Sequence, residues 1–78
     1  QIEIPAIEAD GLSIVVALVK VGLAKSNSEA RRLIRGSGAR LNDVLVSEEN
    51  QVLQPADFAD GRAKISAGKK RHALIVIT

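Results

Sequence analysis

The side chains available for a core are almost all aliphatic, and this limits what the chain can fold into. Phe58 is the only aromatic residue among 78, and the chain has no Trp, Tyr, Met or Cys. A domain of this size buries roughly 60% of the surface that its unfolded chain exposes, so a single core of Leu, Ile, Val and Ala must hold it together. No room is left for an enclosed active-site cavity. The lack of cysteine excludes disulfide bonds and thiolate metal sites.

No targeting or membrane signal is visible in the sequence. The longest strongly apolar runs, 12–19 and 73–77, are too short to cross a bilayer. Glu3 and Glu8 near the start do not fit the basic region of a signal peptide. Because the absence of cysteine also fits a reducing compartment, we expect a cytoplasmic protein. Gln1 as the first residue indicates a segment of a longer chain.

Charge is distributed along the chain in four blocks of alternating sign. Residues 1–24 carry a net charge of −2 and residues 41–61 one of −5, whereas residues 25–40 carry +4 and residues 62–78 carry +5. The net charge of the whole chain is only +2 and hides this pattern. If folding brings the two basic blocks together, they form one positive face suited to a polyanion.

Two helices are predicted in the first half of the chain. Apolar residues at helical spacing within 12–23 indicate a helix that begins near Asp10 or Ser13 and stops at Gly22, although its many β-branched residues leave a strand as the alternative. Ahead of it, residues 1–10 are predicted to be an extended linker, because Pro5 lacks an amide donor and disfavours a helix before it.

The second helix has the clearer signals. Ser26 and Glu29 fit a capping box, and Gly36 and Gly38 end the helix. The apolar residues Ala30, Leu33 and Ile34 should pack on the first helix, while Arg31, Arg32 and Arg35 point elsewhere.

The second half of the chain is predicted to form strands joined by tight turns. Residues 39–41 and 44–46 flank a turn at Asn42-Asp43, a short strand is possible near 51–53, and 62–66 and 71–78 flank a turn at 67–70. The last strand is apolar on both faces, which predicts a central position in the sheet. The fold class is therefore α+β, with two N-terminal helices packed on a small, mostly antiparallel sheet.

The sequence offers no catalytic constellation. His72 is the only histidine, and no acid pair, GxSxG elbow or glycine-rich phosphate loop is present. We expect no catalytic residue and no metal ligand. His72 is interpreted as a surface residue of a strand, with an auxiliary RNA contact as the alternative.

The basic blocks are the candidate functional residues. Arginines beside a helix N-terminus suit phosphate, because the free amides and the forked guanidinium both donate to phosphate oxygens. Binding would use mainly phosphate and shape, since the chain has no Trp or Tyr and a single Phe on which bases could stack. The alternatives are a solvated helix face neutralised by Glu29, and lysines at 69–70 that only protect the adjacent strand from aggregation.

A resemblance narrows these possibilities. The stretch LVKVGLAKSNSEARRLIR at 18–35, followed by GARLN at 38–42, resembles the S4 RNA-binding motif of two helices and a turn into a small sheet. The tail SAGKKRHAL at 66–74 is similar to the end of bacterial tyrosyl-tRNA synthetases, which belong to the same S4 superfamily. The departure is Asp43, because the motif more often has Asn-Gly at this turn.

The resemblance implies a function and a site. Residues 1–10 would link to a catalytic domain and 11–78 would form the S4-like domain, which grips tyrosine tRNA between the anticodon stem and the variable arm. ATP and tyrosine would bind only in the missing catalytic domain of a homodimeric parent, so no cofactor is expected here. Two alternatives stay open. The chain could be the S4 domain of another RNA-modifying or ribosome-associated protein, or it could be a protein-interaction domain. The implied RNA-binding residues are Lys25, Ser26, Asn27, Arg31, Arg32, Arg35, Arg40, Asn42, Lys69, Lys70 and Arg71.

Overall fold

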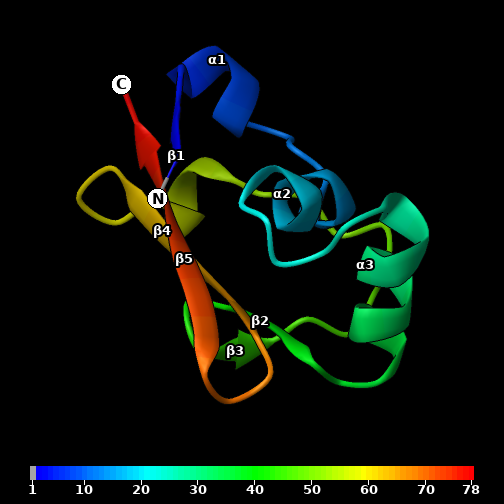
Figure 1. The fold of residues 1–78 in the computed structure, drawn as a ribbon. Coiled ribbons are helices and arrows are strands. Elements are labelled where there is room, and N and C mark those ends of the chain that lie inside the picture. Colours follow the sequence, from blue (N-terminus) through cyan, green and yellow to red (C-terminus); the bar gives the residue numbers. More distant parts are fainter. Residues whose placement is uncertain (1) are drawn as a thin grey trace.

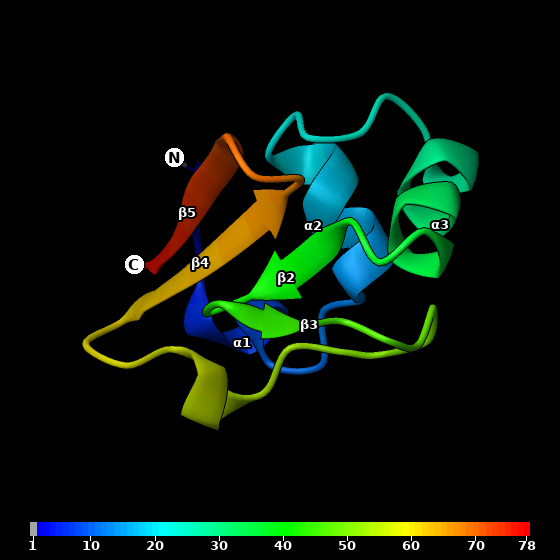
Figure 2. The same ribbon diagram turned by 90° about the horizontal axis from the view of Figure 1, so that it is seen from below.

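The computed structural model describes residues 2–78, which form a five-stranded sheet with helices on one of its faces (Figure 1, Figure 2). Along the chain the elements are β1 (Ile2–Ile4), α1 (Ala6–Ala9), α2 (Ile14–Lys20), α3 (Asn27–Arg35), β2 (Ala39–Leu41), β3 (Val44–Leu45), the 3-10 turn η1 (Pro55–Asp57), β4 (Arg62–Ala67) and β5 (Arg71–Ile77). The predicted α+β class is confirmed, and the order of two helices, a turn and a small sheet is that of an S4-like domain.

The strands lie in the order β1-β5-β4-β2-β3. Neighbouring strands are antiparallel except for β1, which pairs in parallel with β5. The prediction that the last strand is not at an edge is confirmed, because β5 lies between β1 and β4. One face of the sheet carries the core with Ala63, Ile65 and Ile75, all fully buried.

Residues 2–10, which belong to the segment predicted to be an extended linker, are part of the fold. Residues 2–4 are extended, as predicted, but they form β1, and the short helix α1 after Pro5 was not predicted. Ile4 and Ala9 are 6% and 1% exposed and belong to the core. The connection to a preceding domain stays a prediction.

The two main helices form where the sequence signals placed them. α2 begins directly after Ser13 and ends at Lys20. The predicted helix is therefore confirmed over the alternative of a strand, but it is shorter than the apolar segment 12–23. At the start of α3, Ser26 Oγ accepts a hydrogen bond from the Glu29 amide at 3.2 Å. Ala30 and Ile34 are buried against the core, as their spacing predicted.

Both predicted hairpins are present. Asn42 and Asp43 have φ values of 51° and 69°, which is the left-handed conformation of a two-residue turn between β2 and β3. The β4–β5 turn contains Gly68 at φ 72°. The short strand expected near 51–53 is reduced to an isolated bridge between Val52 and Ser13, so this segment pairs with the chain that enters α2.

Asn42 holds the sheet to the connector that follows β3. Its side-chain amide donates to the Asp57 carbonyl at 2.8 Å, and its side-chain oxygen accepts from the Lys64 amide at 2.9 Å. Asparagine also tolerates the left-handed backbone better than most residues. The side chain therefore fixes the β2–β3 turn, β4 and η1 relative to one another.

We expect Asn42→Ala to lower the free energy of unfolding by about 1–2 kcal/mol, because two hydrogen bonds and a conformational preference are lost together. Denaturant unfolding followed by circular dichroism measures this. Asp43→Asn is the control, since it loses only an exposed ion pair and should change stability by less than about 1 kcal/mol. Equal stabilities of the two variants would show that the Asn42 bonds contribute nothing.

Candidate nucleic-acid interface

The arginines of α3 do not form a single face. Arg35 forms a bidentate salt bridge with Glu49. Its Nε donates to Glu49 Oε2 at 2.7 Å, and its Nη2 donates to Glu49 Oε1 at 3.1 Å. The hydrogen bonds from Arg35 hold the pKa of Glu49 below its ordinary value. Lost hydration opposes this shift, and the charges of Arg35 and Arg31 add to it. Arg31 and Arg35 therefore share one side of the helix with an acidic partner. The alternative drawn from the sequence was a helix face on which Glu29 neutralises Arg32 or its neighbour; the ion pair of this helix in the structure joins Arg35 to Glu49.

Arg32 lies on the other side of α3, where the two basic blocks meet. Together with Arg71 it lines a shallow hollow of about 400 Å³, whose wall also includes Leu23, Glu29 and Leu33. Arg32 belongs to the first basic block and Arg71 to the second. The fold thus brings the two blocks together here, as the charge pattern allowed.

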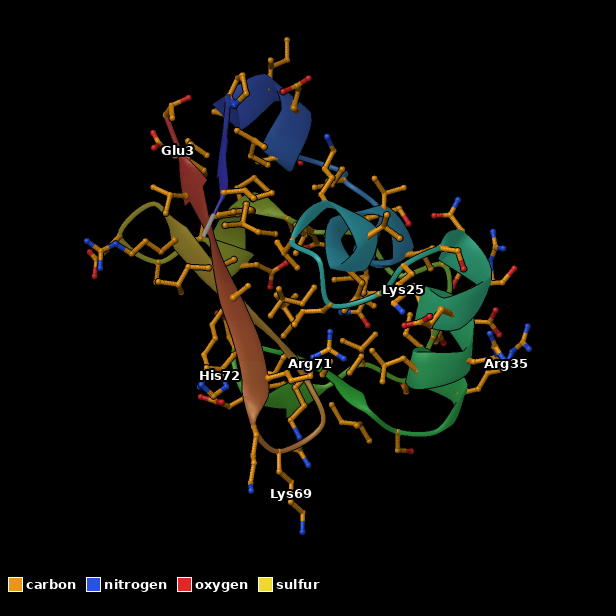
Figure 3. The ribbon with its side chains drawn as sticks, viewed as in Figure 1. Glu3, Lys25, Arg35, Lys69, Arg71 and His72 are labelled. Atoms are coloured by element: carbon orange, nitrogen blue, oxygen red, sulfur yellow. The ribbon has the colours of Figure 1, made fainter. Side chains whose placement is uncertain are left out.

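Arg71 itself has a structural task. Its Nη2 donates to the carbonyl oxygens of Leu23 at 3.0 Å and Gly22 at 3.3 Å. Figure 3 shows its side chain pointing from β5 toward the helices. Because this loop leads directly into the cap of α3, Arg71 fixes the start of the helix whether or not it also contacts a ligand.

A second meeting of the blocks lies on the opposite face of the sheet. Arg40 of β2 and Lys69 of the β4–β5 turn line the same groove, together with Lys64 and His72. Lys64 and His72 were not among the predicted site residues. The signal that could have identified them is the alternation of β4 and β5, which puts residues 64, 66 and 72 on the same side as Arg40.

The remaining predicted residues divide by what their side chains do. Lys25, Asn27 and Lys70 are exposed, and Figure 3 shows Lys25 on the loop that leads into α3. Ser26 is also exposed but its hydroxyl already accepts the capping bond. Asn42 is engaged at both ends of its amide, so in this structure the side chain is not presented to a ligand. An RNA contact by any of them stays a prediction.

Within residues 2–78, no three His, Asp or Glu side chains gather closely enough to hold a metal ion. The helices described there are all too short to cross a membrane.

Comparison with known proteins gives the family. The model of the tyrosine–tRNA ligase SYY-like C-terminal domain matches residues 2–75. The chain belongs to this family, and the predicted resemblance is confirmed.

Individual relatives agree with the family model. Tyrosine–tRNA ligases of Gluconobacter oxydans and Methylocella silvestris are 50% and 49% identical to 96% of the chain, each over 18% of the ligase. That of Rhodospirillum rubrum is 52% identical over 86% of the chain and 16% of the ligase. The chain therefore spans less than a fifth of the length of these relatives, and it matches their C-terminal domain and no catalytic domain.

We expect Arg71→Ala to lower the free energy of unfolding by about 1–2 kcal/mol, because two loop carbonyls lose a charged donor. Lys70→Ala is the matched control and should change stability by less than about 0.5 kcal/mol, since an exposed turn lysine makes few contacts. Thermal unfolding measures both, and NMR shifts confined to residues 22–26 would locate the Arg71 effect. If the two variants are equally stable, the carbonyl contacts of Arg71 are not structural.

Proposed function

We propose that this domain binds tRNA on behalf of a tyrosine–tRNA ligase and holds it by phosphate and shape contacts while the rest of the ligase attaches tyrosine. The observation that carries the proposal is the meeting of two sequence-distant basic blocks in two surface hollows, one with Arg32 and Arg71 and one with Arg40 and Lys69. The family supports the same partner, since its relatives are named for a tRNA substrate.

Binding would proceed through the phosphate backbone. Guanidinium groups donate two parallel hydrogen bonds to phosphate oxygens, and lysines of the β4–β5 turn add mobile positive charge. The first amides of α3 and its dipole also favour an anion near Lys25 and Asn27. The chain has no Trp or Tyr and its one Phe, Phe58, is buried, so stacking on these rings would not be the main mode of binding. Specificity would therefore come from the shape of a folded RNA.

The wider assignment follows from the family and is part of the proposal. The RNA would be tyrosine tRNA, held between its anticodon stem and long variable arm. ATP and tyrosine would bind to the remainder of the ligase, which would act as a homodimer in the cytoplasm. The domain itself would contribute affinity and orientation and no chemical step.

The first test is the salt dependence of binding. If about five or six phosphates are neutralised, log K should fall with log salt concentration at a slope of roughly −4 to −5. A fluorescence titration of this chain with a labelled tyrosine tRNA transcript at several salt concentrations measures the slope. Fragments of ribosomal RNA serve as competitors and should bind more weakly.

The same titration tests the alternative functions. Equal affinity for ribosomal fragments and tRNA would favour another RNA partner for the S4-like surface. No binding, or binding independent of salt, would contradict the proposal. A protein-interaction domain would lose docking to the rest of the ligase when Arg31, Arg32 and Arg35 are all replaced by Ala, with RNA binding unchanged.

The structure also predicts unequal contributions from the α3 arginines. Arg32→Ala should weaken tRNA binding about tenfold, because Arg32 stands beside the second basic block, whereas Arg35→Ala should cost less because Glu49 already occupies that guanidinium. Glu49→Gln should tighten binding about two- to fivefold by releasing Arg35. Glu48→Gln is the control for overall charge, and an equal gain from both variants would show that the Arg35 pair is irrelevant.

A further inference from the structure

The sheet face that carries no helix holds a groove beside the β4–β5 turn. Its volume is about 530 Å³, and the side chains that matter in it are Arg40, Asp43, Lys64, Ser66, Lys69 and His72. In Figure 3, Arg71 points from β5 toward the helices, while Lys69 extends from the tip of the turn and His72 lies on the side of β5 away from α2 and α3. The groove is therefore separated by the sheet from the hollow of Arg32 and Arg71.

The register of the strands builds this groove. Arg40 of β2 is opposite Ser66 of β4, and Ser66 is opposite His72 of β5. Adjacent strands lie about 4.8 Å apart, so this row of three side chains spans roughly 10 Å across the sheet. Lys64 is two residues before Ser66 and so points to the same face. The intervening residues Ala63 and Ile65 are fully buried on the other face.

The charge of the groove suits a phosphodiester. Three basic side chains, Arg40, Lys64 and Lys69, line the groove together with a single carboxylate, that of Asp43. Asp43 accepts from Lys64 Nζ at 3.0 Å, but its side chain is 74% exposed and that of Lys64 38% exposed. An ion pair so open to solvent is weak, so a phosphate can replace the carboxylate as the partner of Lys64.

An apolar hollow continues the groove along β5. It has a volume of about 420 Å³ and is lined by Ala73 and Leu74 together with Lys64 and His72, which line both hollows. A nucleotide has a charged phosphate joined through its ribose to a base whose faces are largely apolar. The two adjoining hollows therefore match the two halves of a nucleotide.

We propose that this groove binds a second backbone segment of the same RNA, so that the RNA is held on both sides of the β4–β5 turn. The proposal rests on the proposed RNA-binding function and adds Lys64 and His72 to the residues that contact RNA. Ser66, which is only 5% exposed, lies in the sheet between Arg40 and His72. The apolar hollow beside Leu74 receives the sugar or base next to the bound phosphate.

The test compares variants of this chain in titrations with the tyrosine tRNA transcript. Lys64→Gln/His72→Gln should weaken binding about three- to tenfold and reduce the salt slope by about one. Asp43→Asn should tighten binding about two- to fivefold, because it removes the carboxylate that competes for Lys64. An opposite change of this kind cannot come from misfolding. Arg62→Gln is the matched control, since Arg62 is exposed on the same strand and does not line the groove.

The outcomes separate the two proposals. If the wild-type chain binds tRNA and Arg32→Ala weakens it, but the groove variants bind like wild type, the groove is not a contact and the proposed function stands. If Arg62→Gln loses as much affinity as the double variant, general surface charge explains the effect and the groove proposal is overturned. If the wild-type chain shows no binding, the proposed function fails and the groove proposal fails with it.

Discussion

A contact between two turns decides where the positive charge of this domain lies. The amide of Gly68, in the β4–β5 turn, donates to the carbonyl of Gly38, just after α3, at 2.7 Å. A side chain at position 38 would crowd Leu33, because a Cβ would lie 2.6 Å from Leu33 Cδ1 and 3.2 Å from the Leu33 carbonyl oxygen. Gly38 belongs to the first basic block and Gly68 to the second. Joining them therefore places arginines of the first block beside lysines and Arg71 of the second.

The parts of the fold that depend on neighbours in sequence could be predicted. The cap of α3 by Ser26 is set by a contact three residues along the chain, and the turn at Asn42-Asp43 by the left-handed backbone of these two residues; both are where the sequence placed them. The parallel strand β1 could not be predicted, because Ile2 pairs with Ile75 at the other end of the chain. The shortening of α2 is also non-local, since the residues before it bond to the segment at 51–53 instead of joining the helix.

In the candidate site, too, the local features could be predicted from the sequence and the long-range contacts could not. Charge and helix periodicity identified the basic residues but not their partners, which are distant: Glu49 is 14 residues from Arg35, and the Leu23 carbonyl is 48 from Arg71. Lys64 and His72 were overlooked for a different reason. The sequence shows that side chains alternate between the two faces of β4 and β5. It does not show which face the helices cover, because that depends on the core, into which Ala63 and Ile65 point.

The acidic block from 41 to 61 explains why a chain with a net charge of only +2 can present strong local fields. Glu49 lies against Arg35 and lowers the positive potential on that side of α3, while Asp43 does the same less completely for Lys64 because both partners are open to water. What stays unneutralised is the region around the β4–β5 turn. A small domain without exposed Phe, Tyr or Trp has few ways to bind a folded RNA, and cations on two sides of one turn would give the orientation that stacking would otherwise supply.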